Sequence, residues 1–187
     1  MESSFGNISF EKCIKNPKSI EINPLAQASE TGNLSALQFL IEECNLDANT
    51  VLFEQYSSLW LAAGNGHKDC VEYLLDHGAN IDFQDKGQQE TPLHATVMRD
   101  ADFVRPTNDF FGCMKLLVDR GVNVNIQDFA GDTPIFFADF EMTKYLVDNG
   151  ADFTIKNKKG ETPLHHAEKQ NYFDNSKKVD FLRSLEK

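Results

Sequence analysis

The chain has 187 residues, 41% hydrophobic and 25% charged, a composition typical of a globular protein and too apolar for a disordered one. That length excludes two large domains. The formal net charge of −11 argues against a nucleic-acid binder, because such proteins use a basic face to contact phosphates. No apolar run approaches the roughly 18 residues of a membrane span, and the first residues lack a signal-peptide pattern. We therefore expect a cytoplasmic protein without a membrane contact.

The N-terminal segment, residues 1–22, does not align with any other part of the chain. Residues 10–14 are predicted to form a short capping helix, which the Asn-Pro pair at 16–17 ends because a residue before proline avoids the helical conformation. From residue 23 onward the sequence is organised differently.

Five segments of the remaining chain align with one another. Thr-Pro-Leu-His stands at 91–94 and 162–165, and related tetrapeptides stand at 23–26, 57–60 and 133–136. Each is followed by a helix-like stretch, and in three units the following apolar run ends at a glycine: Gly78, Gly121 and Gly150. A hydroxyl residue before the first turn starts a helix, and glycine in the left-handed conformation ends one. One unit is thus predicted to be a hairpin, a helix, a turn and a second helix, which bury their apolar faces by stacking on neighbours.

The second positions of successive tetrapeptides are separated by 34, 34, 42 and 29 residues. This spacing and the Thr-Pro-Leu-His motif resemble the ankyrin repeat, which has a period of about 33 residues and a Thr-Pro-Leu-His-x-Ala signature. The resemblance implies an all-α repeat solenoid in which stacked helix-turn-helix units are joined by β-hairpin loops. It also implies that His94 and His165 are structural and that partners bind at the hairpin tips and the inner helices. The expected domain covers residues 23–187, with repeats near 23–56, 57–90, 91–132, 133–161 and 162–187.

Two units depart from the repeat length, and the last departs in composition. The third carries about nine extra residues within 99–111, and the fourth lacks four. The insertion either packs over the gap left by the short fourth repeat, through Phe103, Val104, Phe110 and Phe111, or forms a second binding element. In the last unit Lys178 and Arg183 replace apolar residues, which predicts an outer face that meets water as a C-terminal cap.

No residue pattern indicates catalysis. The neighbouring His165 and His166 point in diverging directions on a helix, so a metal site is not expected. Cys70 and Cys113 share one repeat position and are explained by packing, and four widely spaced cysteines fit a reducing compartment. We expect no cofactor, and an enzyme is only a remote alternative.

The predicted partner site lies at the hairpin tips, where most units carry polar residues. Phe53, Tyr56 and Phe129 are aromatic exceptions, with Met98 and Phe140 near the ends of neighbouring first helices. Glu54 and Asp132, with Asp128, place negative charge around them. These side chains either fold back on the array or anchor a protein or peptide with a basic surface. The chain is thus predicted to be a non-enzymatic binding module, monomeric when unbound, or alternatively a regulator that inhibits or assembles a partner enzyme.

Overall fold

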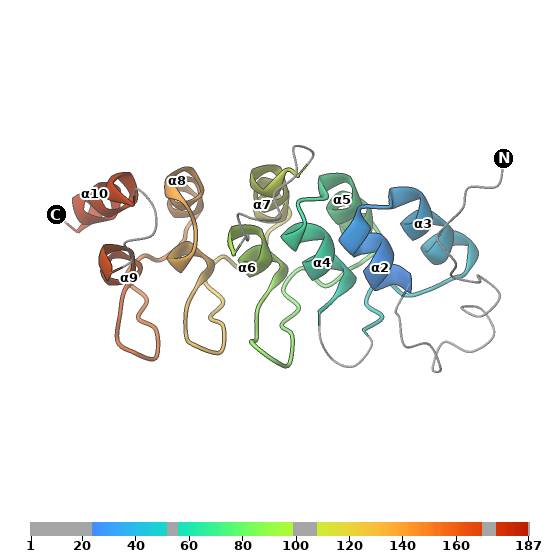
Figure 1. Cartoon of the computed structure of the whole chain (residues 1–187), viewed down its shortest axis with the longest axis horizontal. Helices are drawn as coiled ribbons and strands as arrows, with labels where there is room; N and C mark the ends of the chain where they lie inside the picture. Colours follow the sequence, from blue (N-terminus) through green and yellow to red (C-terminus); the bar gives the residue numbers. More distant parts are fainter. Residues whose placement is uncertain (1–23, 52–55, 99–107, 170–174, 187) are drawn as a thin grey trace.

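A computed structural model describes residues 24–51, 56–98, 108–169 and 175–186, in which pairs of helices stack in one elongated row (Figure 1). The loops that join successive pairs project from one side of the row, and the inner helices lie between these loops and the outer helices. The inner helices are α2 (Pro24–Thr31), α4 (Ser58–Gly64), α6 (Pro92–Val97), the 3₁₀ helix η3 (Pro134–Phe136) and α9 (Pro163–Lys169). The outer helices are α3 (Leu34–Gln38), which the π-helix η1 (Phe39–Glu43) continues, α5 (Lys68–Asp76), α7 (Phe110–Asp119), α8 (Phe140–Asp148) and α10 (Ser176–Leu185).

This arrangement confirms the all-α repeat solenoid. No described residue lies in a β-strand. The hairpin-shaped loops instead carry single pairing bonds, such as the one from the amide of Asp128 to the carbonyl of Asp132 (2.9 Å). No helix of the described ranges is long and apolar enough to cross a membrane.

The predicted start and stop residues act at the helix ends. The hydroxyl of Ser57 accepts a hydrogen bond from the amide of Trp60 (3.1 Å), and that of Thr91 accepts one from the amide of His94 (3.3 Å). Gly78 and Gly121 end α5 and α7 at φ +80° and +84°, a conformation that favours glycine. Capping residues therefore set where these helices begin and end.

The core runs along the seam between inner and outer helices. It is built from leucines that recur once per unit, so each helix pair presents the same apolar residue to its neighbours. Fully buried examples on the outer helices are Leu37, Leu74, Leu117, Leu146 and Leu182.

The end of the insertion is fastened to the second unit. The amide of Asp109 donates to the carbonyl of Gly66 (2.9 Å), while its carboxylate accepts from the amide of Gly112 (2.7 Å) and caps α7. Phe110 and Phe111 therefore belong to α7, at the end of the range 99–111 within which the extra residues were expected. Phe110 is buried, and Phe111 contacts the ring of Tyr145 on α8 edge to face (5.9 Å between centroids). Phe103 and Val104 lie outside the described residues, as do residues 1–22.

The shortened fourth unit explains an unexpected burial. Its first helix is the single turn η3, and the carbonyls of Ile135, Phe136 and Ala138 have no further turn to bond with. The ammonium group of Lys178 on α10 donates to all three, at 3.0, 3.0 and 2.7 Å. Lys178 is only 3% exposed. The prediction that it faces water was wrong, because it replaces the missing turn as donor to these carbonyls.

Arg183 does lie at the surface, where it pairs with Glu168 (2.7 Å). Burial lowers the pKa of Lys178 to about 8, since a charged ammonium is disfavoured in an apolar environment. The carboxylate of Asp139, which caps α8, opposes this effect. The last unit is thus held to the fourth by a buried cation.

Candidate functional site

Three hairpin tips, residues 84–90, 127–132 and 156–161, line one side of the row. Each has an Asp or Asn at the same place: Asp85, Asp128 and Asn157, all buried. Asp85 accepts hydrogen bonds from the amides of Gly87 (2.6 Å), Gln88 (2.8 Å) and Glu90 (2.8 Å). These side chains satisfy amides that a tight turn leaves without a backbone partner, so they serve the loop rather than a ligand.

Hydrogen bonds also join each tip to the next. The amide of Phe129 donates to the carbonyl of Gln88 (2.7 Å), and the amide of Lys158 donates to the carbonyl of Ala130 (2.9 Å). The side chain of Gln127 reaches the carbonyl of Lys156 (3.2 Å). The three tips therefore form one continuous edge, whose residues keep fixed spacings without a partner.

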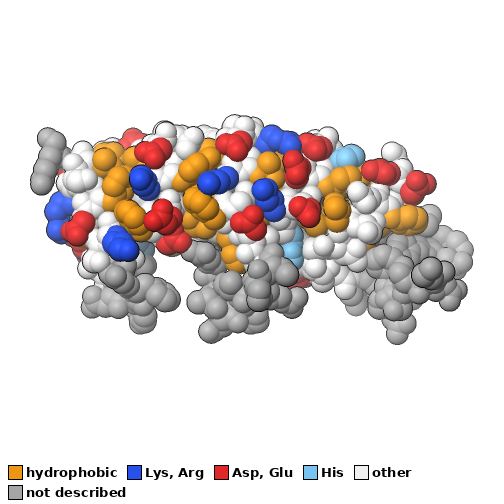
Figure 2. All heavy atoms as spheres, turned by 90° about the horizontal axis from the view of Figure 1, so that it is seen from above, with side chains coloured by type: hydrophobic (Ala, Val, Ile, Leu, Met, Phe, Trp, Pro, Cys, Tyr) orange, Lys and Arg blue, Asp and Glu red, His pale blue; other side chains and the backbone are white. Residues whose placement is uncertain are grey.

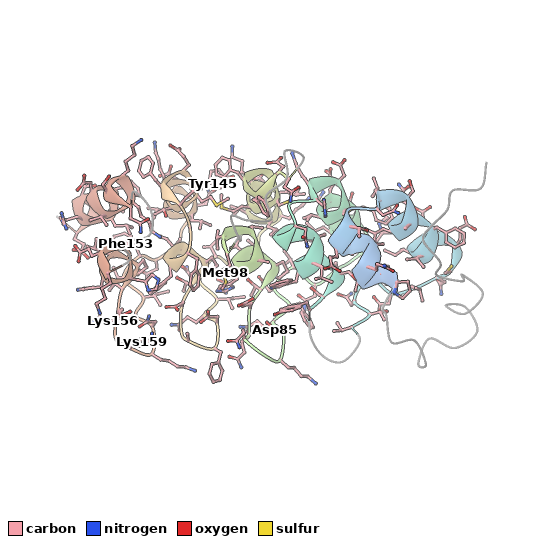
Figure 3. The ribbon with its side chains drawn as sticks, in the orientation of Figure 1. Asp85, Met98, Tyr145, Phe153, Lys156 and Lys159 are labelled. Carbon is pink, nitrogen blue, oxygen red and sulfur yellow. The ribbon has the colours of Figure 1, made fainter. Side chains whose placement is uncertain are left out.

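Three of the predicted apolar residues are exposed on this side of the array. Phe129 is 57% exposed, Met98 39% and Tyr56 37%. Met98 ends α6, directly above the hairpins, and Asp85 lies in the loop below it (Figure 3). Tyr56 stacks on Trp60, with ring centroids 3.8 Å apart. Burial, with a smaller effect from Glu90 and Asp85, raises the pKa of the Tyr56 hydroxyl, so this ring remains neutral at physiological pH.

The other predicted site residues fall elsewhere. Phe53 and Glu54 lie outside the described residues. Phe140 begins the outer helix α8 and contacts the ring of Phe181 on α10 (6.1 Å), so it is not at the end of a first helix as expected. The carboxylate of Asp132 is buried and accepts a hydrogen bond from the Asn157 side chain (2.7 Å). Phe140 and Asp132 therefore do not join the exposed surface.

The two histidines have different surroundings. His94 is fully buried: its Nδ1 accepts from the amide of Thr91 (3.2 Å), and its Nε2 lies 3.2 Å from the carbonyl of Asp132 on the next hairpin. Because burial lowers the pKa of His94, the neutral ring with hydrogen on Nε2 fits both contacts. The Nδ1 of His165 lies 2.7 Å from the hydroxyl of Thr162, but this ring is exposed, since no described hairpin follows it. Only His94 therefore bonds both to its own Thr and to the following hairpin.

The described cysteines do not resemble nucleophiles. Cys70 and Cys113 are free thiols, and both are buried. Burial, with a neighbouring carboxylate, raises the pKa of Cys70 to about 11 and that of Cys113 to about 12, so both remain protonated. The described residues hold no group of three or more His, Cys, Asp and Glu side chains placed to bind a metal ion.

Charge at the tips differs from the acidic surround that the sequence suggested. Asp85, Asp128 and Asp132 turn inward, whereas Lys86, Lys156, Lys158 and Lys159 are exposed. The ammonium group of Lys158 lies 4.3 Å from the centroid of the Phe129 ring. Counting charges along the sequence missed this arrangement, although an Asp or Asn recurring at one place of each hairpin is a signal for an inward-facing turn residue.

Comparison with known proteins identifies the family of the chain. The family description "Ankyrin repeats (3 copies)" matches residues 11–106 and 107–184. The chain is 44% identical over 62 residues to cortactin-binding protein 2 of Rattus norvegicus and 45% identical over 62 residues to that of Dasypus novemcinctus, in each case over 33% of this chain and 4% of the relative. It thus spans a small fraction of the length of these relatives. The repeated helix pairs, the capping Thr and Gly residues and the match over most of its length show that the chain belongs to the ankyrin-repeat family.

Proposed function

We propose that the chain is a non-enzymatic interaction module that binds a protein or peptide on the side formed by its hairpin tips and inner helices. The observation that carries this proposal is the exposure of Phe129, Met98 and Tyr56 on that side. Large apolar side chains dominate the energetics of protein interfaces, and here Phe129 stands on an edge held by hydrogen bonds between tips. Little conformational entropy is then lost when a partner binds. The names of the relatives, which refer to binding of cortactin, agree in kind with such a role.

Only some of the predicted site residues belong to the proposed binding surface. Tyr56, Met98 and Phe129 form its described part, and we retain Phe53 and Glu54 as sequence-based members. Asp132 and Phe140 are left out because each contacts another part of the array. The predicted basic partner depended on acidic side chains around the rings, and the inward orientation of Asp128 and Asp132 gives it no support at the tips.

We also propose that the unbound chain is a cytoplasmic monomer. Free Cys70 and Cys113 suit a reducing compartment. Light scattering coupled to size-exclusion chromatography tests the oligomeric state, and a mass near 21.1 kDa is expected. A dimer mass would contradict this part of the proposal without affecting the binding surface.

Partner binding is tested with two matched double variants. Copurification and mass spectrometry first identify a partner, whose affinity is then measured for the parent, for Met98→Ala/Phe129→Ala and for Phe39→Ala/Leu185→Ala. The control pair consists of exposed apolar residues on the outer helices. We expect the first variant to lose at least ~2 kcal/mol of affinity, about 30-fold in Kd, and the control to bind as the parent does.

Circular dichroism must show both variants folded to the same extent. Equal affinities for the parent and Met98→Ala/Phe129→Ala would overturn the proposed surface. If the identified partner is an enzyme, its rate with and without the chain also separates simple binding from regulation.

A further inference from the structure

The exposed side chains of the three hairpin tips carry only positive charge. In residues 84–90, 127–132 and 156–161 the exposed side chains are lysines and glutamines with Phe129 and Ala130. The acidic residues of these tips are buried, except for the half-buried Glu161. This edge belongs to a chain whose formal net charge is −11. The acidic excess therefore lies elsewhere, and exposed carboxylates such as Glu72, Asp119 and Glu141 stand on the outer helices, the face seen in Figure 2.

The lysines of the last tip are not neutralised within the described part of the molecule. No ion pair there includes Lys156, Lys158 or Lys159, although Glu161 lies at the end of the same hairpin. Glu161 instead forms an ion pair with Lys169 (2.5 Å), which holds the pKa of its carboxyl below the usual range, and the charge of Lys159 adds a smaller effect. Lys156 and Lys159 extend from the hairpin that precedes α9 (Figure 3). Their ammonium groups are thus available to a ligand.

The ammonium group of Lys158 lies beside an exposed apolar side chain. The ring of Phe129 is more than half exposed, and the ammonium group of Lys158 lies 4.3 Å from its centroid. The bond from the Lys158 amide to the Ala130 carbonyl fixes the two tips against each other. A partner segment able to use both features needs an apolar side chain for Phe129 and carboxylates for the lysines.

We propose that the hairpin edge around Phe129, Lys158 and Lys159 binds an acidic segment of a partner protein, in which aspartate or glutamate flanks an apolar residue. The inference rests on the proposed function and assigns the chemistry of its partner. The acidic remainder of the chain repels such a segment, so the tips become the place where it docks. Association is electrostatically steered and falls with rising salt.

Peptide selection tests this directly. A phage library of random 12-residue peptides is selected on the immobilised full chain, and enriched peptides are titrated by fluorescence anisotropy. Enriched sequences should combine Asp or Glu with an aromatic residue or Leu. Lys158→Glu/Lys159→Glu should weaken them by at least about 10-fold at 50 mM salt, and 500 mM salt should weaken binding to the parent by a similar factor.

The matched control is Lys144→Glu/Lys177→Glu, which changes the net charge equally at exposed lysines of α8 and α10. We expect it to alter affinity less than about 3-fold. Equal losses in both variants would overturn the proposal, because they would reflect net charge alone, and so would enriched acidic peptides that bind the tip variant normally.

The same selection separates this inference from the proposed function. Basic or neutral peptides that bind the parent but not Met98→Ala/Phe129→Ala would overturn the acidic partner and leave the binding surface standing. Peptides insensitive to every tip variant, or no enrichment at all, would overturn both.

Discussion

Replacing Lys178 by methionine should destabilise the C-terminal units. Methionine retains most of the side-chain volume but removes the donor to the carbonyls of Ile135, Phe136 and Ala138. The carbonyl of Ala138 still accepts a hydrogen bond from the Thr143 hydroxyl (3.3 Å), so two carbonyls are left without a donor. At about 1–3 kcal/mol for each, the loss is about 2–6 kcal/mol. An opposing gain comes from no longer burying a cation: the lowering of the Lys178 pKa from 10.5 to about 8 corresponds to about 3 kcal/mol. The net expectation is a loss of about 1 kcal/mol, within a range from a gain of about 1 to a loss of about 3.

Denaturant unfolding monitored by circular dichroism measures this loss, and hydrogen exchange locates it. Because an array of repeats is stabilised by contacts between neighbours, the substitution should raise the exchange rates of amides in α9 and α10 relative to the parent more than those in α4 and α5. Lys177→Met is the control, since Lys177 precedes Lys178 on the same helix and is exposed. It should change stability by less than ~0.5 kcal/mol. A Lys178→Met variant more stable than Lys177→Met by over about 1 kcal/mol would refute the reasoning, because the hydrogen bonds would then contribute less than the cost of burying the charge.

Three further predictions follow from the same geometry. Between pH 8 and 9 the unfolded chain retains the Lys178 proton that the folded chain releases, so the stability of the parent relative to Lys178→Met should rise by about 1 kcal/mol. This window lies below the pKa values of Cys70 and Cys113 in the folded chain. Urea titrations in which the difference between parent and variant stays flat or falls would contradict the prediction. His94→Ala should cost about 2–3 kcal/mol and His165→Ala less than about 1, because only His94 is buried and bonded to a following hairpin; similar denaturation midpoints would count against this. Deleting residues 162–187 should lower the free energy of unfolding by several kcal/mol and cause aggregation, since it exposes Ile135 and Phe136 and removes the Lys178 donor from their carbonyls. A truncated chain that stays soluble and keeps the parent's melting temperature would show that the last unit is not a cap.

Much of the fold was predictable because the repeat makes each local signal occur several times. Thr91 and Gly78, for example, mark helix ends in one unit, and equivalent residues mark them in others. Whether the Lys178 side chain points into the core or into solvent was not predictable from its polarity alone. A signal was nevertheless present, because aligning Val179 with Val71 places Lys178 at the position of the buried Cys70, next to a unit that lacks four residues.

The candidate surface was predictable only in part. An aromatic residue at a polar turn position identifies Phe129 without any structure, and its exposure agrees with that interpretation. The sign of the surrounding charge depends on side-chain orientation, which composition does not contain. Asp128 turns inward to accept amides of its own loop, whereas Lys158 reaches outward beside the ring. Phe140 was misplaced because the shortened fourth unit moves it from the end of an inner helix to the start of an outer one.

The contact between Lys178 and the shortened fourth unit also links two sequence changes that lie about 40 residues apart. A chain with the short unit and an apolar residue at 178 has two carbonyls without donors, those of Ile135 and Phe136, whereas a chain with a full-length first helix and Lys178 buries a cation without acceptors. Each change is unfavourable alone, and the two together are compatible. An insertion that restores a full turn after Phe136 should therefore be tolerated only when Lys178 is replaced by a small apolar residue, so this pair of sites forms one unit of sequence variation.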